Sequence, residues 1–395
     1  MNTDNVASAF YARLFNGAAI VGGIGILASI VGAVIAPEQF FRGWLFGLQF
    51  WLGISLGCLA ILMMHHLMGG AWGVATRRHF EAGAMVMPLM AFLFVPVLFG
   101  LPSIYLWARP AALAADPVLQ HKASYLNPSS FAIRASVYVL LWSAMAFCFF
   151  RWSRAQDETT EAAPSRRMEA LAGPGLLLLI LSGSFAWMDW LMSVEPHWYS
   201  SIYPLMIMAG HALAAMALVV WMSSQIAGDA ALAPVFTPKR FHDLGTLLFA
   251  FVFFWAYLCY AQLIVIWSGN LKDEIPWYLT RIVGGWSSIA GALFIFAFAI
   301  PFFLLLFRHL KRNPKTLGRI AFGAFLMQIV NSYWLIASPF QTNGPEFRWQ
   351  YVAALVGVGG IWLACYARWM RQRPLLPVHA PGYVEALPHG AAQPA

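Results

Sequence analysis

The stretch GWLFGLQFWLGISLGCLAILMM, residues 43–64, contains no charged residue and is long enough to cross a lipid bilayer. Hydrocarbon about 30 Å thick needs roughly 20 apolar residues of helix, because lipid cannot hydrogen-bond a bare backbone. Nine other stretches share this property. The ten candidate spans cover roughly residues 15–35, 43–64, 82–106, 130–152, 170–193, 199–223, 241–268, 281–307, 316–338 and 349–370. The sequence therefore predicts an all-α, polytopic membrane protein with ten transmembrane helices.

The composition agrees with this fold class. The chain is 61% hydrophobic and only 10% charged, and its mean hydropathy is +0.67. Soluble domains are about 45–50% apolar and about 25% charged. The net charge of +8 does not indicate nucleic-acid binding, because the basic residues lie in the connectors between spans, where they report orientation. The lipid bilayer is the expected partner, and no nucleic acid is expected.

The basic residues are distributed unequally between the two sides of the membrane. The N-terminus, the even-numbered loops and the C-terminal tail together hold 17 of the 24 Lys and Arg residues. The other side holds six, and Arg134 falls inside the fourth span. The positive-inside rule therefore places both termini in the cytoplasm. The first 16 residues lack a small-residue cleavage site, which predicts that the first span is retained.

Two regions are expected along the chain. Residues 1–373 form the integral membrane domain, and the Pro- and Ala-rich residues 374–395 form a disordered cytoplasmic tail. Similar spacing of the second to fifth and the sixth to ninth spans predicts two four-helix bundles in parallel repeat, with the first and tenth helices peripheral. The Gly22-Gly23-Ile24-Gly25 run predicts a close helix–helix approach.

The cysteines and histidines argue against a redox centre or a metal site in this chain. Cys58, Cys148, Cys259 and Cys365 fall singly in four different spans, so no CxxC pair supports an iron–sulfur cluster, a thioredoxin-like site or covalent haem attachment. Only His211 of ten histidines lies deep in a span. A haem held by two histidines inside the bundle is therefore not expected.

Polar side chains at membrane depth are costly and favour a functional hypothesis. Ordered from the cytoplasmic face outward, they are His65, His66, Glu81, His242 and Asp243; then His211, Gln328 and Asn331; then Gln49 and Gln262; and finally Asp189, Glu195, His197, Asp273 and Glu274. A ladder with one imidazole at its centre could pass protons or orient a polar headgroup, because histidine titrates near neutral pH.

Structural interpretations of the same residues stay open. His65 and His66 can mark the point where a helix leaves the lipid. His211 can hydrogen-bond a neighbouring helix, and Asp189 can pair with Arg134 or Arg281.

Several strings resemble one family of membrane proteins. They are FWLGISLG (50–57), HHLMGGAW (65–72), HKASYLN (121–127), DWLMSVEPHWYS (189–200), HDLG (242–245), FWAY (254–257) and WYL (277–279). Together they resemble the ActF family, the second quinone-binding-type membrane subunits of bacterial alternative complex III, a quinol:cytochrome c oxidoreductase. That family is distantly similar to the NrfD-like membrane subunits of polysulfide reductase. The resemblance extends from the second span to the ninth.

The resemblance implies a non-redox subunit of a respiratory quinol-oxidising complex in the bacterial cytoplasmic (inner) membrane. It implies a quinone or quinol as the only cofactor. The implied partners are a sister NrfD-like membrane subunit, an iron–sulfur subunit and multihaem cytochrome c subunits. It implies no catalytic residue or metal ligand in this chain. Candidate residues of a quinone site or proton pathway are His65, His66, Asp189, Glu195, His197, His211, His242 and Asp243.

The chain departs from the family pattern in two places. Asn331-Ser332-Tyr333 stands where an acidic residue often precedes a Tyr, and Thr246 follows HDLG where a Lys is common. An amide cannot titrate, which weakens the case for a proton path through the ninth span.

Two other functions remain open: a secondary transporter with a midplane site near His211, and a purely structural scaffold. A transporter is active alone in liposomes, whereas a subunit of the complex co-purifies with cytochromes and an iron–sulfur protein.

Overall fold

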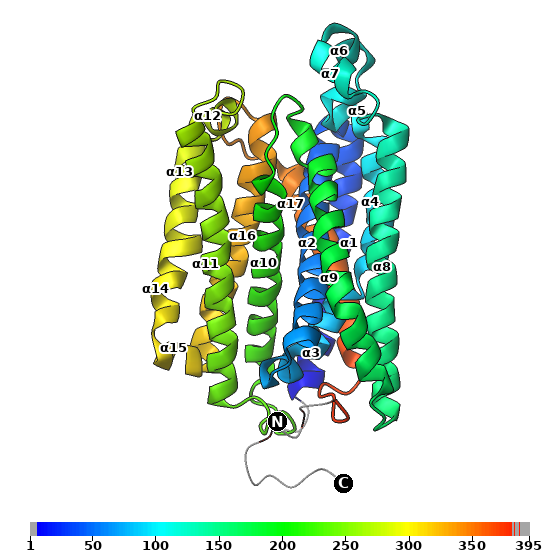
Figure 1. Cartoon of the computed structure of the whole chain (residues 1–395), viewed down its shortest axis with the longest axis vertical. Coiled ribbons are helices and arrows are strands. Elements are labelled where there is room, and N and C mark those ends of the chain that lie inside the picture. The colour runs from blue at the N-terminus through cyan, green and yellow to red at the C-terminus, as the bar shows by residue number, and fades with distance from the viewer. Residues whose placement is uncertain (1–5, 381–382, 384–386, 388–395) are drawn as a thin grey trace.

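The computed structural model describes residues 6–380, 383 and 387. This part of the chain is predominantly helical and contains no strand. Ten of its helices are long and apolar enough to cross a membrane, and they run side by side along one direction (Figure 1). The predicted fold class, an all-α protein with the architecture of a multi-pass membrane protein, is confirmed.

The membrane-crossing helices begin and end as follows: α1 (Val6–Ile35), α2 (Pro37–Met68), α3 (Ala71–Ala84) continued by α4 (Met87–Phe99), α8 (Pro128–Glu158), α9 (Ala163–Trp190), α10 (Ile202–Ile226), α11 (Pro238–Gly269), α13 (Trp286–Ala292) continued by the π-helical η4 (Leu293–Ala299) and by α14 (Ile300–Leu306), α16 (Pro314–Ala337) and α17 (Trp349–Arg371). Short helices connect them: α5 (Leu101–Ile104), η2 (Leu106–Ala108), α6 (Pro110–Ala115), α7 (Pro117–Lys122), η3 (Met192–Val194), α12 (Pro276–Ile282), α15 (Arg308–Arg312) and η5 (Ser338–Phe340).

Side-chain caps and proline set several helix starts. Asn127 accepts a hydrogen bond from the backbone N–H of Ser130 at the start of α8, and Thr237 accepts one from that of Arg240 at the start of α11. A proline follows each of these two caps, where its missing N–H costs no helical hydrogen bond.

The third span differs from the prediction. Its helices cover Ala71 to Phe99 instead of roughly 82–106. The difference arises because Arg77 and Arg78 lie buried inside α3, where both donate to Glu81. Charges that neutralise one another allowed the helix to begin earlier than its hydropathy indicated.

The helices form two sets of four. In the first, α2 packs against α3, α4 and α9, and α8 packs against α4 and α9. In the second, α10 packs against α11 and α16, α14 packs against α11, and η4 packs against α16. The central helices α2 and α10 pack against each other and are the most buried of the ten.

Helices α1 and α17 pack together outside the two sets, and glycine allows their close approach. A Cβ atom placed on Gly25 would lie 2.4 Å from the backbone nitrogen of Gly357, and one on Gly22 would lie 2.8 Å from the carbonyl carbon of Gly360. Gly23, on another face of α1, has nothing within 4 Å of its Cβ position. The predicted close approach at this glycine run is confirmed.

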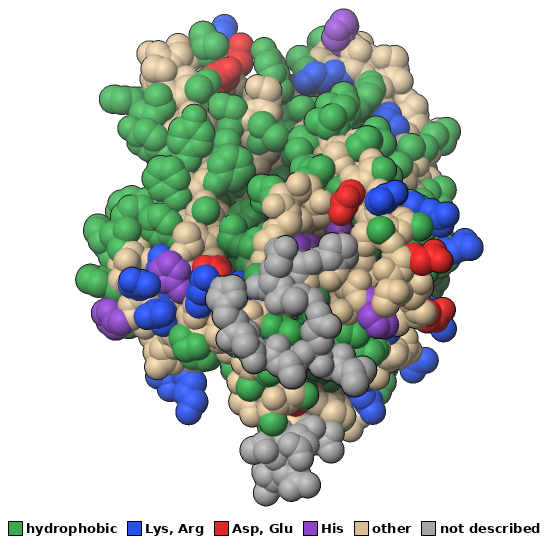
Figure 2. Space-filling view, turned by 60° about the horizontal axis from the view of Figure 1, so that its bottom comes forward, with side chains coloured by type: hydrophobic (Ala, Val, Ile, Leu, Met, Phe, Trp, Pro, Cys, Tyr) green, Lys and Arg blue, Asp and Glu red, His purple; other side chains and the backbone are tan. Residues whose placement is uncertain are grey.

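The two ends of the bundle differ in charge. Helix α1 begins and α17 ends at the end of the bundle that also carries α3 and α15, at the bottom of Figure 1. Lys and Arg side chains surround this basic end when it is turned forward (Figure 2). Helices α5, α6, α7 and α12 lie at the opposite end. Most of the predicted disordered tail, 374–395, lies outside the described residues.

Candidate functional site

The eight candidate residues lie in separate places in the bundle. His65 and His66 lie at the basic end of α2, and His242 and Asp243 lie at the basic end of α11. His211 lies within α10, and Asp189, Glu195 and His197 lie towards the opposite end. Within residues 6–380, no hydrogen bond joins His211 to another of the eight.

Asp189 forms a buried ion pair with Arg134. Arg134 donates from Nε and Nη2 to the two carboxylate oxygens, at 2.8 and 3.2 Å, and Tyr138 donates its hydroxyl at 3.2 Å. The side chain of Asp189 is only 1% exposed. Of the two partners that the sequence left open for Asp189, the structure shows Arg134.

Arg281, the other possible partner, binds Glu195 instead. Its Nη2 atom lies 2.6 Å from Glu195 Oε2, and the guanidinium also donates to the carbonyls of Trp277 and Leu335. Its central carbon lies 4.0 Å above the ring centre of Trp277. The arginine is fully buried, so this ion pair is a fixed part of the fold at the end opposite the basic end.

His197 is largely exposed, and its Nε2 atom lies 2.6 Å from Asp116 Oδ2. Desolvation raises the pKa of the Asp116 carboxyl, but the hydrogen bonds from His197 and from the backbone N–H groups of Val118 and Leu119 together outweigh it and hold that pKa below its usual value.

The histidines at the basic end pack against neighbouring rings and backbone. His65 and His66 have ring centres 5.4 Å apart, and His66 stacks on Phe149. His65 lies so close to Gly73 that a Cβ there would be 1.9 Å from its Nδ1 atom. On α11, His242 Nδ1 lies 3.8 Å from the neighbouring Asp243 carboxylate, which also pairs with Arg240.

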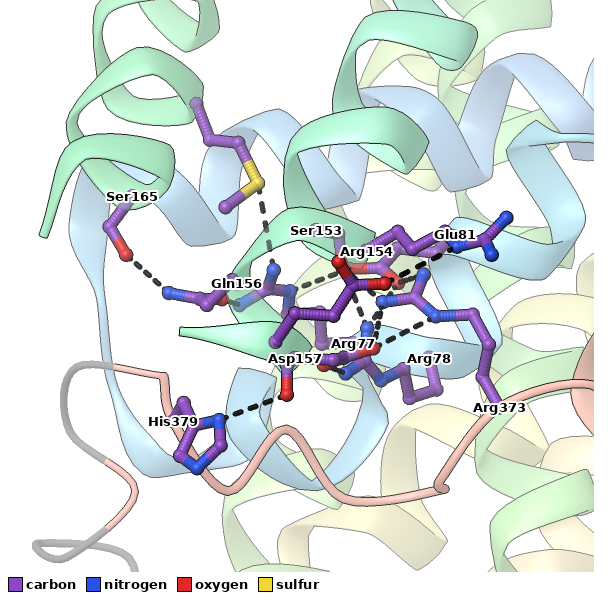
Figure 3. Close-up of polar contacts among 12 residues, drawn as sticks. Arg77, Arg78, Glu81, Ser153, Arg154, Gln156, Asp157, Ser165, Arg373 and His379 are labelled. Atoms are coloured by element: carbon purple, nitrogen blue, oxygen red, sulfur yellow. Dashed lines mark hydrogen bonds and ion pairs between the residues drawn. The ribbon is translucent and has the colours of Figure 1, made fainter. Parts of the chain in front are cut away.

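Charged side chains form a buried ionic cluster at the basic end (Figure 3). The sequence pointed to Glu81 but did not predict the cluster. The carboxylate of Glu81 accepts from Arg77 at 2.6 Å, Arg78 at 2.9 Å, Arg373 at 3.1 Å and Ser153 at 2.6 Å. Asp157 on α8 pairs with both Arg78 and Arg373. The signal available in the sequence was the spacing of Arg77, Arg78 and Glu81, which places all three on neighbouring turns of one helix.

His211 lies between the two helix sets in a polar centre, which consists of the side chains of Gln49, His211, Gln328 and Asn331. His211 Nε2 lies 3.0 Å from Gln49 Oε1 on α2, and the ring of Trp187 packs 4.8 Å away. Gly53 makes room for the imidazole, because a Cβ there would lie 2.3 Å from its ring atoms. The sequence identified His211 as the deep titratable group but not its partner.

A second polar pair faces this centre from α16. Asn331 donates from Nδ2 to Gln328 Oε1 at 3.2 Å. Gln49, His211, Gln328 and Asn331 all line one cavity of about 10 Å³.

An apolar cleft lies in the second helix set, between α11 and the α13–η4–α14 helix. It has a volume of about 440 Å³. Its wall includes the exposed side chains of Phe253, Tyr257 and Phe294, and its inner residues include Trp255 and Asn331. One wall is the π-helical η4, a helix form that is rare and frequently found at functional sites.

The polar groups of this cleft are few. The indole N–H groups of Trp255 and Trp277 are buried and donate to no described residue. Asn331 contributes an amide, and Tyr278 a hydroxyl. The sequence did not predict the cleft, because the residues that line it have the pattern of an ordinary apolar helix.

Comparison with known proteins does not identify the family: no protein-family model matches this sequence, and no curated protein matches it. Within the described residues, no group of three or more His, Cys, Asp or Glu side chains could hold a metal ion.

Proposed function

We propose that this chain is an integral membrane subunit of a respiratory quinol:cytochrome c oxidoreductase complex of the ActF type, in which it binds a quinone or quinol in the cleft between α11 and the α13–η4 helix. A sister NrfD-like subunit, an iron–sulfur subunit and multihaem cytochrome c subunits would complete the complex in the bacterial inner membrane. The chain itself would supply no redox centre, metal ligand or catalytic residue.

The cleft is the observation that carries this proposal. Its volume of about 440 Å³ falls in the range of small-molecule sites. Its rim contains lipid-facing side chains such as Phe253 and Phe294, which are 53% and 64% exposed. A ligand dissolved in the bilayer could therefore enter sideways, without crossing water.

The chemistry of the lining matches a quinone headgroup. Quinone oxygens accept hydrogen bonds, and the cleft lining includes two side-chain donors, the amide of Asn331 and the hydroxyl of Tyr278. Aromatic rings from Tyr257, Tyr260 and Phe298 offer faces on which a flat ring can stack. An isoprenoid tail would remain against the apolar outer wall.

The role of the chain in quinol oxidation would be to hold and orient this ligand. Oxidation of a quinol releases two electrons and two protons. The electrons would pass to the iron–sulfur and haem groups of the partner subunits, because this chain is proposed to carry none.

A cleft-filling substitution tests the proposal. Ala290→Phe places a ring among the cleft residues and should lower photolabelling by an azido-quinone at least tenfold while the protein still folds. Ala144→Phe, on the exposed face of α8, is the matched control and should label like the wild type. Peptide mapping should place the label on α11 and on α13 to η4. Equal labelling of both variants, or a label elsewhere, would contradict the proposal.

The polar centre around His211 favours a secondary transporter as the second candidate. Its cavity of about 10 Å³, however, is far smaller than the several hundred Å³ of a small-molecule site. Isolation of the tagged chain from its native membrane separates the two functions. Co-purifying cytochromes and extractable quinone support the subunit. Substrate uptake by the chain alone in liposomes supports the transporter. If neither result is obtained, a structural scaffold is the remaining function.

A further inference from the structure

The cavity at the polar centre has the size of a single water molecule. It measures about 10 Å³, which is about the space that one water requires. Gln49 of α2, His211 of α10 and Gln328 of α16 line it, and each is less than 5% exposed. Asn331 and Ser332 also line it, and the rest of the wall, which includes Phe50 and Ile207, is apolar. Such a cavity holds water only if it offers two to four polar partners.

Three side-chain nitrogens around this cavity have no partner among the described residues. They are Gln49 Nε2, His211 Nδ1 and Gln328 Nε2. The protein satisfies the other polar atom of each side chain: Gln49 Oε1 meets His211 Nε2 at 3.0 Å, and Gln328 Oε1 accepts from Asn331. Buried polar atoms are rarely left unpaired, because such an atom gives up its hydrogen bonds to water and gains none in exchange.

The hydrogen-bond roles of these nitrogens fit one water molecule. Gln49 Oε1 can only accept, so His211 Nε2 donates, and Nδ1 of the neutral imidazole is then an acceptor. A water can donate to His211 Nδ1 while accepting from the amide N–H groups of Gln49 and Gln328. Three hydrogen bonds are typical of a buried water. A metal cation fits poorly, because two of the three groups present N–H donors rather than oxygen ligands.

We infer that this cavity is a hydration site for one water molecule, bonded to Gln49, His211 and Gln328, and that Asn331 joins it to the cleft. The water links α2 of the first helix set to α10 and α16 of the second. Asn331 lines both the cavity and the cleft and hydrogen-bonds Gln328. Only this last link rests on the proposed function.

The wild-type protein gives the first test. A cryo-EM map of the full chain in nanodiscs, at a resolution that shows other buried waters, should contain a peak about 2.7–3.2 Å from the three nitrogens. An empty cavity would overturn the inference. So would a peak held only by oxygens at about 2.4 Å, which would be a cation.

Gln328→Met gives the second test, because it keeps the side-chain length and removes the amide. The peak should disappear, and the melting temperature should fall. Gln225→Met, at the exposed end of α10, should change neither. An unchanged peak and melting temperature in Gln328→Met would contradict the inference, and the wild-type map decides the question if that variant does not fold.

Asn331→Leu tests the link to the cleft. The water peak should remain, while the affinity for a quinone analogue should fall about tenfold, the equivalent of one hydrogen bond. An affinity within twofold of wild type would disprove the link. If the wild-type protein binds no quinone analogue, the proposed function fails, whereas the water peak still tests the hydration site.

Discussion

At the scale of single residues, the position of His211 depends on the absence of a side chain at Gly53. An added Cβ would lie 2.3 Å from the imidazole, and Trp187 packs against the same ring. We expect Gly53→Ala to displace His211 from Gln49 and to lower the free energy of unfolding by about 1–3 kcal/mol, as overpacked sites do. Gly23→Ala, with nothing within 4 Å, is the control. Thermal melts of both variants in nanodiscs measure the difference, and equal melts would show that the ring moves freely.

Two candidate carboxylates should behave differently when neutralised. Asp189 is buried and bound twice by Arg134, so Asp189→Asn leaves a poorly compensated guanidinium and should cost on the order of 3 kcal/mol of stability. Asp243 is 35% exposed, so Asp243→Asn should cost less than about 1 kcal/mol. A fall in turnover per assembled complex with Asp243→Asn but normal stability would reveal a functional carboxylate. Equal loss of stability in both variants would contradict this ranking.

At the scale of helices, the contact between α1 and α17 depends on backbone proximity. A Cβ on Gly357 would lie 2.8 Å from the carbonyl carbon of Gly25, so Gly357→Leu should force the two helices apart. Two cysteines introduced at facing positions of α1 and α17 should then form a disulfide more slowly. Gly23→Leu should leave its rate unchanged. An unchanged rate in Gly357→Leu would mean that α1 is held by other contacts.

The sequence predicted the helices better than it predicted their polar partners. Hydropathy and small-residue patterns are local, so the ten spans could be predicted, and so could the close approach of a neighbouring helix at residues 22–25. The partner of His211 could not, because Gln49 is 162 residues away. The start of α3 was misplaced, because burial of Arg77 and Arg78 depends on Glu81 and on Asp157 of α8. The cleft beside η4 is made of apolar side chains and left no signal in the sequence.

At the scale of the whole molecule, the charge distribution predicts orientation in the membrane. The basic end should face the cytoplasm by the positive-inside rule. Reporters fused after Arg154 and after Arg312 should therefore read cytoplasmic, and one fused after Asp273 should read external. A single reversed reporter would contradict the assigned topology.

The ionic cluster at the basic end joins α3, α8 and the segment after α17, so its charge balance affects the whole bundle. Three guanidiniums, from Arg77, Arg78 and Arg373, face the carboxylates of Glu81 and Asp157. Glu81→Gln leaves three cations against one anion, and we expect it to cost on the order of 3–5 kcal/mol.

Arg373→Gln should be milder, about 1 kcal/mol, because Arg77 and Arg78 still hold Glu81 and the remaining charges cancel. For the same reason, Arg373→Gln should partly rescue Glu81→Gln in the double variant. Unfolding in denaturing detergent, followed for both single variants and the double variant, measures this coupling. Additive effects would show that charge balance does not govern the cluster, and that each hydrogen bond acts separately.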